Sequence, residues 1–164
     1  MQPVKIGNRS IGAGFPTWFV AEIGINHNGD IRVAKELIDI ASAAGCDAVK
    51  FQKRTPEICV PSNQQQQMRE TPWGYITYLE YRNRVELGEN EYTSIAHHST
   101  RNGICWLGSC WDKPSVDFLE RFEPPCYKIP SACLTDDDLL RHIRRTRKPI
   151  ILSTGMSTLA QVDH

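Results

Sequence analysis

Short apolar runs alternate with polar loops and amphipathic stretches along most of the chain. The runs lie at residues 19–23, 48–52, 104–109, 126–130 and 149–155. Runs of this length, bounded by Gly, Pro and polar residues, are typical of buried strands. The stretches between them repeat apolar residues every three or four positions, as helices with one buried face do. This alternation predicts an α/β fold with about five parallel strands and helical crossovers.

The elements near the N-terminus have recognisable ends. Residues 1–15 predict a small β-hairpin with a Gly7-Asn8 turn. After the first run, Asp30 or Asn28 can cap a helix, and Gly45 can end it. We therefore expect a hairpin, then the first strand of the sheet, then a helix that ends at Gly45.

Segment 54–90 interrupts the alternation. It is polar, with four consecutive glutamines at 64–67 and three prolines. A stretch of this length without regular structure is usually functional or disordered, so we predict a long insertion loop. Aromatic residues between Trp73 and Tyr81 indicate that its second half packs against something.

Composition limits the class of protein. Of the 164 residues 40% are hydrophobic, which is typical of a packed domain. The 19 Lys+Arg balance the 19 Asp+Glu, so the chain lacks the net positive charge typical of nucleic-acid-binding proteins. No apolar run approaches the ~20 residues of a membrane helix, and the start lacks a signal peptide. We therefore predict a cytoplasmic protein with no nucleic-acid or membrane partner. Its six cysteines form no C-x-x-C pair, which favours reduced, structural thiols.

Polar residues follow several of the predicted strands. Since the carboxyl ends of parallel strands carry the site in such sheets, these residues are the candidates. They are Glu22, Asn26, His27, Asn28, Lys50, Gln52, Lys53, Ser109, Lys128, Ser131, Ser153 and Thr154. Lys50 and Lys128 stand out, because burying an unpaired ammonium group costs several kcal/mol. An anionic ligand between them would offset that cost, and nearby serine hydroxyls suit phosphate oxygens.

Two structural interpretations compete with this ligand site. The lysines can instead pair with Glu22 or Asp112 in a closed ring of salt bridges. His27 can cap a helix rather than contact a ligand. The salt-bridge ring explains one lysine as well as a ligand does, but it explains the whole set of lysines and hydroxyls less well.

Four segments together resemble the sialic acid synthase family. They read EIGINHNG at 22–29, DAVKFQ at 47–52, YKIPSA at 127–132 and KPIILSTGMS at 148–157. The similarity runs from about Val4 to the last residue in order and spacing, so it is more specific than any single motif. Enzymes of this family condense phosphoenolpyruvate with N-acetylmannosamine or a related acylamino sugar.

The resemblance implies a (β/α)8 TIM barrel that uses a divalent metal, Mn²⁺ or Mg²⁺, whose ligands lie on later strands and not in this chain. It implies that Lys50 and Lys128 hold the carboxylate and phosphate of phosphoenolpyruvate. Ser131 and Ser153 would donate to the phosphate, and Glu22 would lie at the reacting centre.

The resemblance also implies substrate-binding residues around these groups. Asn26, His27 and Asn28 would line the mouth of the site, and Gln52 belongs to the same set. Many members read Ser-Thr-Pro after the third strand, where this chain reads SCWD at 109–112. The expected threonine hydroxyl is missing, and Ser109 is the replacement we assign.

A closed barrel needs about 250 residues, so residues 1–164 are interpreted as its N-terminal portion. The C-terminal half and a small antifreeze-like domain are expected to be absent, and the chain alone to be inactive. It would pair with a second copy or with a complementing C-terminal half. The alternative is a non-catalytic half-barrel that binds an anionic ligand or a partner chain. A sister group that uses sugar phosphates is a rival within the enzymes, but segments 26–29 and 153–156 resemble the sialic acid branch more closely.

Overall fold

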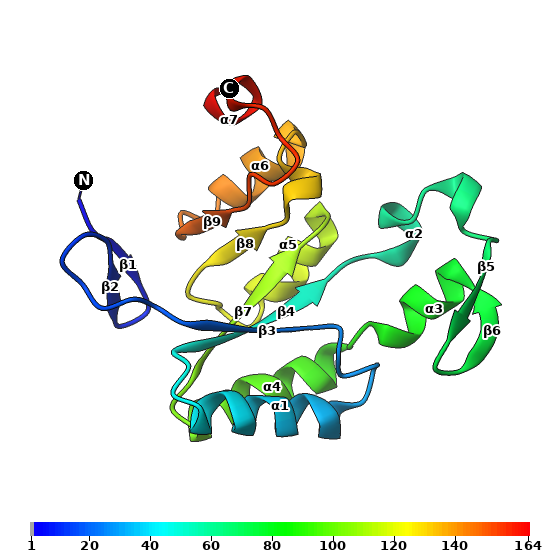
Figure 1. The fold of residues 1–164 in the computed structure, drawn as a ribbon, viewed down its shortest axis with the longest axis horizontal. Helices are drawn as coiled ribbons and strands as arrows, with labels where there is room; N and C mark the ends of the chain where they lie inside the picture. The colour runs from blue at the N-terminus through cyan, green and yellow to red at the C-terminus, as the bar shows by residue number, and fades with distance from the viewer. Residues whose placement is uncertain (1) are drawn as a thin grey trace.

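The computed structural model describes residues 2–164 and is built around a five-stranded parallel sheet (Figure 1). In sheet order the strands are β3 (Val20–Gly24), β4 (Ala48–Lys53), β7 (Cys105–Cys110), β8 (Tyr127–Ile129) and β9 (Ile150–Leu152). Each strand pairs with the one that precedes it along the chain in this sheet, as in a (β/α)8 barrel. The predicted fold class, a partial barrel with helical crossovers and an N-terminal hairpin, is confirmed.

Helices connect the strands on one face of the sheet. They are α1 (Ile31–Ala43), α4 (Glu89–Arg101), α5 (Lys113–Glu120) and α6 (Asp137–Arg144), with a short α7 (Leu159–Asp163) after β9. The Asp30 carboxylate accepts the Arg32 N–H at the start of α1, which confirms the predicted cap. Within residues 2–164 no helix has the length and apolar character needed to cross a membrane.

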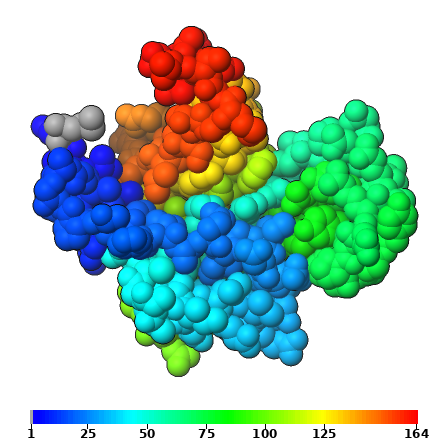
Figure 2. All heavy atoms as spheres, viewed as in Figure 1, coloured from blue at the N-terminus to red at the C-terminus, as the bar shows by residue number. Residues whose placement is uncertain are grey.

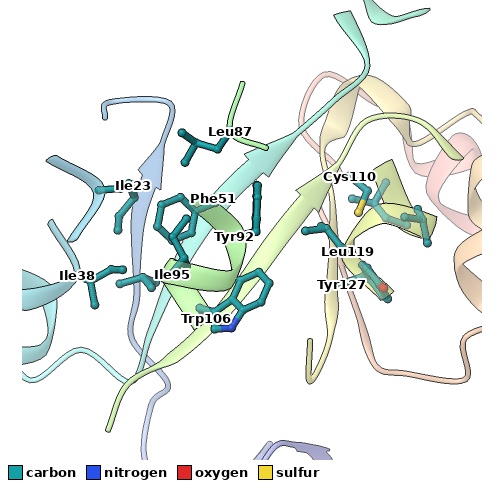
Figure 3. Packing of buried hydrophobic residues seen from close by; sticks show 14 of the residues in the cluster. Ile23, Ile38, Phe51, Leu87, Tyr92, Ile95, Trp106, Cys110, Leu119 and Tyr127 are labelled. Carbon is teal, nitrogen blue, oxygen red and sulfur yellow. The ribbon is translucent and has the colours of Figure 1, made fainter. Parts of the chain in front are cut away.

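Aromatic side chains fill the space between the sheet and its helices (Figure 3). Tyr92 of α4 is 1% exposed and lies at the centre of this cluster. Its ring centroid is 6.4 Å from that of Phe51 on β4, 5.8 Å from Trp106 on β7 and 5.2 Å from Phe118 on α5. The Tyr92 hydroxyl donates to the Gln52 carbonyl at 3.2 Å. This core therefore holds β4 in place through the face of the strand that the helices cover.

The opposite face of the sheet has a smaller apolar cluster at the amino ends of the strands. The hairpin β1 (Val4–Ile6) and β2 (Arg9–Ile11) supplies Ile6, which packs with Ala48, Leu107 and Cys126. Because side chains alternate between faces, the next residues on this face of β4 and β8 are Lys50 and Lys128. The inner face thus changes from apolar to charged along the strands. Residue 1, part of the expected hairpin segment 1–15, lies outside the described residues.

Segment 54–90 has regular secondary structure, so the prediction of one long insertion loop is wrong. It contains α2 (Pro56–Cys59), a 3₁₀ turn (Ser62–Gln64), the antiparallel hairpin β5 (Met68–Thr71) and β6 (Gly74–Thr77), and α3 (Tyr78–Val85). Figure 2 shows it as a lobe beside the sheet. Packing among its own side chains gives it structure: Tyr78 stacks with Tyr81, and the Arg69 guanidinium lies 3.7 Å from the Tyr78 ring centroid. Strands this short leave little periodicity in the sequence.

All six cysteines are free thiols, which confirms the prediction from their spacing. Burial raises the pKa of Cys105 to about 11 and that of Cys126 to about 12. Such thiols stay protonated at neutral pH and act as small apolar side chains.

Two glycines give a matched test of the loop between β3 and α1. Gly29 and Gly45 have φ values of 75° and 80°, but a Cβ at Gly29 would lie 2.2 Å from the Arg84 carbonyl oxygen, while a Cβ at Gly45 meets nothing within 4 Å. We expect Gly45→Ala to cost about 1–2 kcal/mol of unfolding free energy. Gly29→Ala should cost roughly 2 kcal/mol more, because α3 must also shift. Urea unfolding followed by circular dichroism measures both, and equal losses would contradict the clash.

Candidate functional site

The centre of the candidate site is an ion pair between neighbouring strands. Glu22 of β3 and Lys50 of β4 are register partners, and Lys50 Nζ pairs with Glu22 Oε2. The Lys50 side chain is 11% exposed, whereas the Glu22 side chain is 53% exposed. The register shifts at a bulge between Glu22 and Gly24, and bulges re-aim the side chains beside them. The pair is therefore buried on the lysine side and open on the carboxylate side.

Lys128 lies close to this pair without a carboxylate of its own. Burial lowers the pKa of Lys128, the nearby Lys50 ammonium lowers it further, and Glu22 partly opposes both effects. Within residues 2–164, no salt bridge involves Lys128. Two cations thus lie beside one carboxylate. The alternative of a closed ring of salt bridges is not seen among the described residues, where only the Lys50–Glu22 pair forms.

Asp112, the other carboxylate considered for that ring, serves a different purpose. It caps α5 by accepting the Ser115 N–H at 2.8 Å, and it accepts the Thr55 N–H at 2.6 Å. Burial opposes its ionisation, but hydrogen bonds from Thr55, Cys59 and Ser115 keep the pKa of Asp112 below its usual value. Asp112 therefore joins the chain segments that leave β4 and β7 and does not neutralise the lysines.

Polar groups extend from the lysines across the sheet. Gln52, Ser109 and Lys128 are register partners on β4, β7 and β8. Ser131 begins the turn after β8, and a Cβ at Gly155 would lie 3.7 Å from its hydroxyl oxygen, so Ser131 adjoins the segment after β9. Ser153 follows β9 directly and donates its N–H to the Ile129 carbonyl. Ser109 thus lies near the end of β7, and Ser131 and Ser153 lie after β8 and β9.

The loop after β3 differs from the expectation that Asn26, His27 and Asn28 all line the mouth. Asn26 and Asn28 are exposed, but His27 is 2% exposed and packs 6.0 Å from the Phe51 ring. His27 Nδ1 accepts the Gly29 N–H at 3.0 Å. Its burial lowers the pKa of the imidazole, and a backbone hydrogen bond at Gly24 opposes the shift. His27 holds the loop from inside, because its polar atoms are already used by the backbone.

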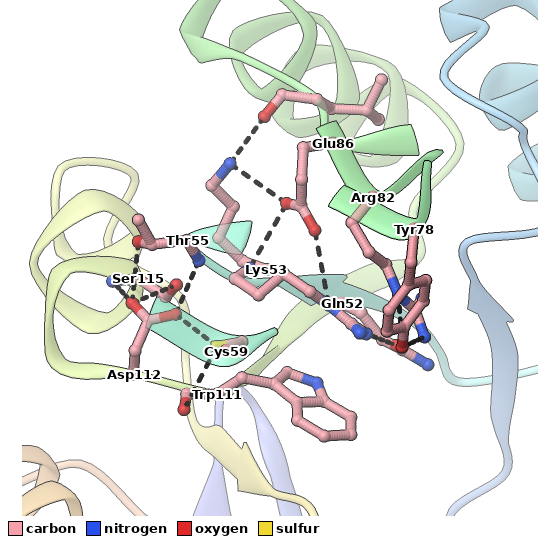
Figure 4. Close-up of polar contacts among 12 residues, drawn as sticks. Gln52, Lys53, Thr55, Cys59, Tyr78, Arg82, Glu86, Trp111, Asp112 and Ser115 are labelled. Carbon is pink, nitrogen blue, oxygen red and sulfur yellow. Dashed lines mark hydrogen bonds and ion pairs between the residues drawn. The ribbon is translucent and has the colours of Figure 1, made fainter. Parts of the chain in front are cut away.

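Arg54 is the residue that the sequence reasoning missed. It follows β4, is 5% exposed, and lies with its guanidinium 4.3 Å from the Trp111 ring centroid. One nitrogen donates to Gln52 Oε1, and Nε lies 3.4 Å from Glu86 Oε1. Figure 4 shows Gln52 and Glu86 beside Tyr78 and Arg82 of α3. Burial and the neighbouring Arg82 lower the pKa of Arg54.

Only part of this network leaves a signal in the sequence. Lys53 and Arg54 are adjacent cations at the end of a predicted strand, which would have justified including Arg54 among the candidates. Their shared partner Glu86 is far along the chain, with Lys53 Nζ 3.2 Å from its Oε2. Nothing in its local sequence points to that contact.

The arrangement suits an anion better than a metal ion. Lys50 and Lys128 present two ammonium groups, and charge-assisted hydrogen bonds from such groups bind carboxylate and phosphate. Ser109, the assigned hydroxyl donor, is 1% exposed, so its contact with a ligand stays a prediction. Within the described part of the chain, no three His, Cys, Asp or Glu side chains gather closely enough to hold a metal ion. The described residues therefore do not fit a metal site, and no chemistry is assigned to a metal.

The chain is similar to known proteins in both sequence and structure. The model of the NeuB family matches residues 37–164. An uncharacterized protein of Methanocaldococcus jannaschii is 36% identical over 99% of this chain and 44% of its own length. The N,N'-diacetyllegionaminic acid synthase of Campylobacter jejuni is 34% identical over 90% of this chain and 45% of its own length. The crystal structure of the N-acetylneuraminic acid synthetase of Leptospira borgpetersenii has a TM-score of 0.87 at 25% identity, covering 99% of this chain and 53% of that one. The chain thus spans less than half the length of the curated relatives it matches.

His27 predicts a pH dependence of stability. Its folded-state pKa is lowered, so the unfolded chain binds more protons below about pH 6.5. Stability should therefore fall as the pH drops below that value, by at most about 1.4 kcal/mol per pH unit, and this contribution should be constant above it. His27→Gln should remove that slope, and His97→Gln, at an exposed position on α4, should retain it. Urea unfolding from pH 5 to 8 measures the slopes, and an unchanged slope in His27→Gln would contradict this assignment.

Proposed function

Because this chain belongs to the NeuB family, we propose that it takes part in condensing phosphoenolpyruvate with N-acetylmannosamine or a related acylamino sugar. The products are a sialic acid-type nonulosonate and phosphate. The observation that carries the proposal is a pair of neighbouring cations, the half-buried Lys128 and the buried Lys50, for which Glu22 is the one nearby carboxylate among residues 2–164. The synthases among the relatives support the same reaction class.

The electrostatic balance of the site favours phosphoenolpyruvate as the first ligand. This molecule brings about three negative charges, which fixed cations must match in a partly dry site. Lys50 and Lys128 supply two positive charges on the inner face of the sheet, and Glu22 offsets one of them, so the described residues match part of the ligand's charge. Ser131 and Ser153, and the buried Ser109, are the proposed hydroxyl donors. In this proposal the chain carries mainly the phosphoenolpyruvate-binding half of the enzyme.

The proposed reaction joins two carbons and releases phosphate. C3 of phosphoenolpyruvate attacks the aldehyde carbon of the open-chain sugar, water adds at C2, and the C2–O bond to phosphate breaks. Lys50 and Lys128 hold the carboxylate and phosphate so that C3 faces the sugar. Glu22 is half exposed beside Lys50, within reach of the sugar carbonyl or of the attacking water. Gln52, Asn26 and Asn28 are the proposed contacts to the sugar, and the expected Mn²⁺ or Mg²⁺ stays a prediction.

A partner chain is part of the proposal. β9 is an edge strand, and a groove of about 950 Å³ beside it is lined by apolar side chains such as Leu140 and Leu152 and by polar ones such as Asp137 and Arg141. Open strand edges and apolar grooves favour pairing with further structure. A second copy of the chain or a complementing C-terminal half would serve, and the cytoplasm stays the predicted location.

A non-catalytic role is the second candidate. The observation that favours it is the cation pair itself, which needs no further catalytic group to hold an anion. A half-barrel with Lys50 and Lys128 could bind an anion without turning it over. Phosphate release from phosphoenolpyruvate and N-acetylmannosamine with Mn²⁺, measured on the chain together with a complementing C-terminal half, separates the two candidates. Release supports the enzyme, and no release supports the non-catalytic role; we expect none from this chain alone.

Calorimetric titration with phosphoenolpyruvate tests the binding site. Lys50→Ala and Lys128→Ala should each weaken binding at least about tenfold, since each removes a charge-assisted hydrogen bond. Lys113→Ala is the control: it removes one positive charge from an exposed side chain that pairs with Asp138. It should change affinity less than about twofold, as surface ion pairs contribute little. Equal affinity in all four proteins would remove both lysines from the site.

A further inference from the structure

We propose that Arg54 is a positioning residue that sets which end of the Gln52 side-chain amide faces the site. The proposal rests on the proposed function only for the identity of the ligand. Arg54 itself lies behind Gln52, buried against Trp111. It therefore acts through Gln52 rather than by touching substrate.

The chemistry of the two side chains determines the orientation of the amide. A guanidinium has only donors, so the Gln52 atom that meets it must be the carbonyl oxygen. The Gln52 NH₂ group then points the other way, toward the neighbouring strand β3. A Cβ placed at Gly24 would lie 3.2 Å from Gln52 Nε2 and 3.0 Å from Glu22 Oε1, so both polar groups adjoin the same point. Glu22 has only acceptors at neutral pH, which favours the same orientation.

Arg54 is held in a way that a lysine could not reproduce. One guanidinium nitrogen donates to Gln52 Oε1, while Nε lies at an ion-pair distance of 3.4 Å from Glu86 Oε1 without a hydrogen bond, and the guanidinium carbon lies over the Trp111 ring. The Arg54 backbone N–H also donates to Glu86 Oε2 at 3.3 Å. A lysine ammonium is a single nitrogen that cannot stack or meet two separate partners in the same geometry.

The result is a pair of complementary groups beside Gly24. Gln52 presents N–H donors and Glu22 presents carboxylate acceptors around Gly24. A hydroxyl group can accept from the one and donate to the other, which suits the acylamino sugar of the proposed reaction. A reversed Gln52 amide would place its oxygen toward the Glu22 carboxylate. The ligand hydroxyl would then face two acceptors and could donate to only one of them.

Side-chain amide NMR of the ligand-free chain tests the positioning directly. The Gln52 NH₂ signals are identified by their loss in Gln52→Glu. In Arg54→Met and Arg54→Lys we expect them to move to the positions of a freely rotating glutamine, with loss of the heteronuclear NOE of an ordered group. Arg54→Lys keeps a cation beside Glu86, so it remains informative if Arg54→Met fails to fold.

Lys53→Met is the matched control. Lys53 pairs with the same Glu86 carboxylate, at 3.2 Å, but its ammonium lies 4.7 Å from the Phe118 ring on the helix-covered face and has no contact with Gln52. The Gln52 signals should stay in place in this variant. If they move equally in the Lys53 and Arg54 variants, Arg54 only supports Glu86 and the proposal is wrong.

Binding separates this proposal from the proposed function. Arg54→Lys should keep phosphoenolpyruvate affinity within about twofold, because both lysines remain, and should weaken N-acetylmannosamine binding to the phosphoenolpyruvate-saturated chain about tenfold, the equivalent of one net hydrogen bond. If the Gln52 amide rotates freely in Arg54→Lys but the affinity for N-acetylmannosamine is unchanged, the orientation of Gln52 plays no part in sugar recognition and that part of the proposal is wrong. Failure of the unsubstituted chain to bind phosphoenolpyruvate would count against the proposed function, while the amide signals would still decide the positioning by Arg54.

Discussion

Two buried or half-buried ammonium groups share one carboxylate, and the rest of the site is organised around that imbalance. Lys50 pairs with Glu22, while Lys128 has its pKa lowered by burial and by Lys50 itself. Leaving a cation in such surroundings costs free energy that folding must supply elsewhere. The aromatic core around Tyr92 on the other face of the sheet supplies apolar burial that holds β4 in place. The site is thus prepared for negative charge before any ligand arrives.

The sequence predicted most of this arrangement because strands and their ends leave local signals. The five apolar runs became the five strands, and the polar residues after them lie at one end of the sheet, as parallel topology requires. Pro130 ends β8 as its missing N–H dictates. The two lysines were recognisable because charged residues inside apolar runs need an explanation.

The features that the sequence did not predict depend on long-range contacts. His27 looks like a surface loop residue, and only its packing on Phe51 and its bond to Gly29 make it an internal support. Glu86 is separated by a whole lobe from the residues it pairs with. The hairpin in segment 54–90 is stabilised by cation–π and aromatic stacking between residues whose spacing fits no single period. Periodicity reports which face of an element is buried, but it does not report what that element meets.

The lobe formed by segment 54–90 supports the site rather than covering it as a loop. Its end supplies Glu86, which holds Lys53 and Arg54 after β4. The Arg84 carbonyl lies against Gly29, in the loop that leaves β3, so closely that no side chain fits there. The two strands that provide Glu22, Lys50 and Gln52 are therefore held by the same short stretch of α3 and the residues after it. Since a shift in that stretch would move both strand ends together, the lobe links the geometry of the Glu22–Lys50 pair to the orientation of Gln52.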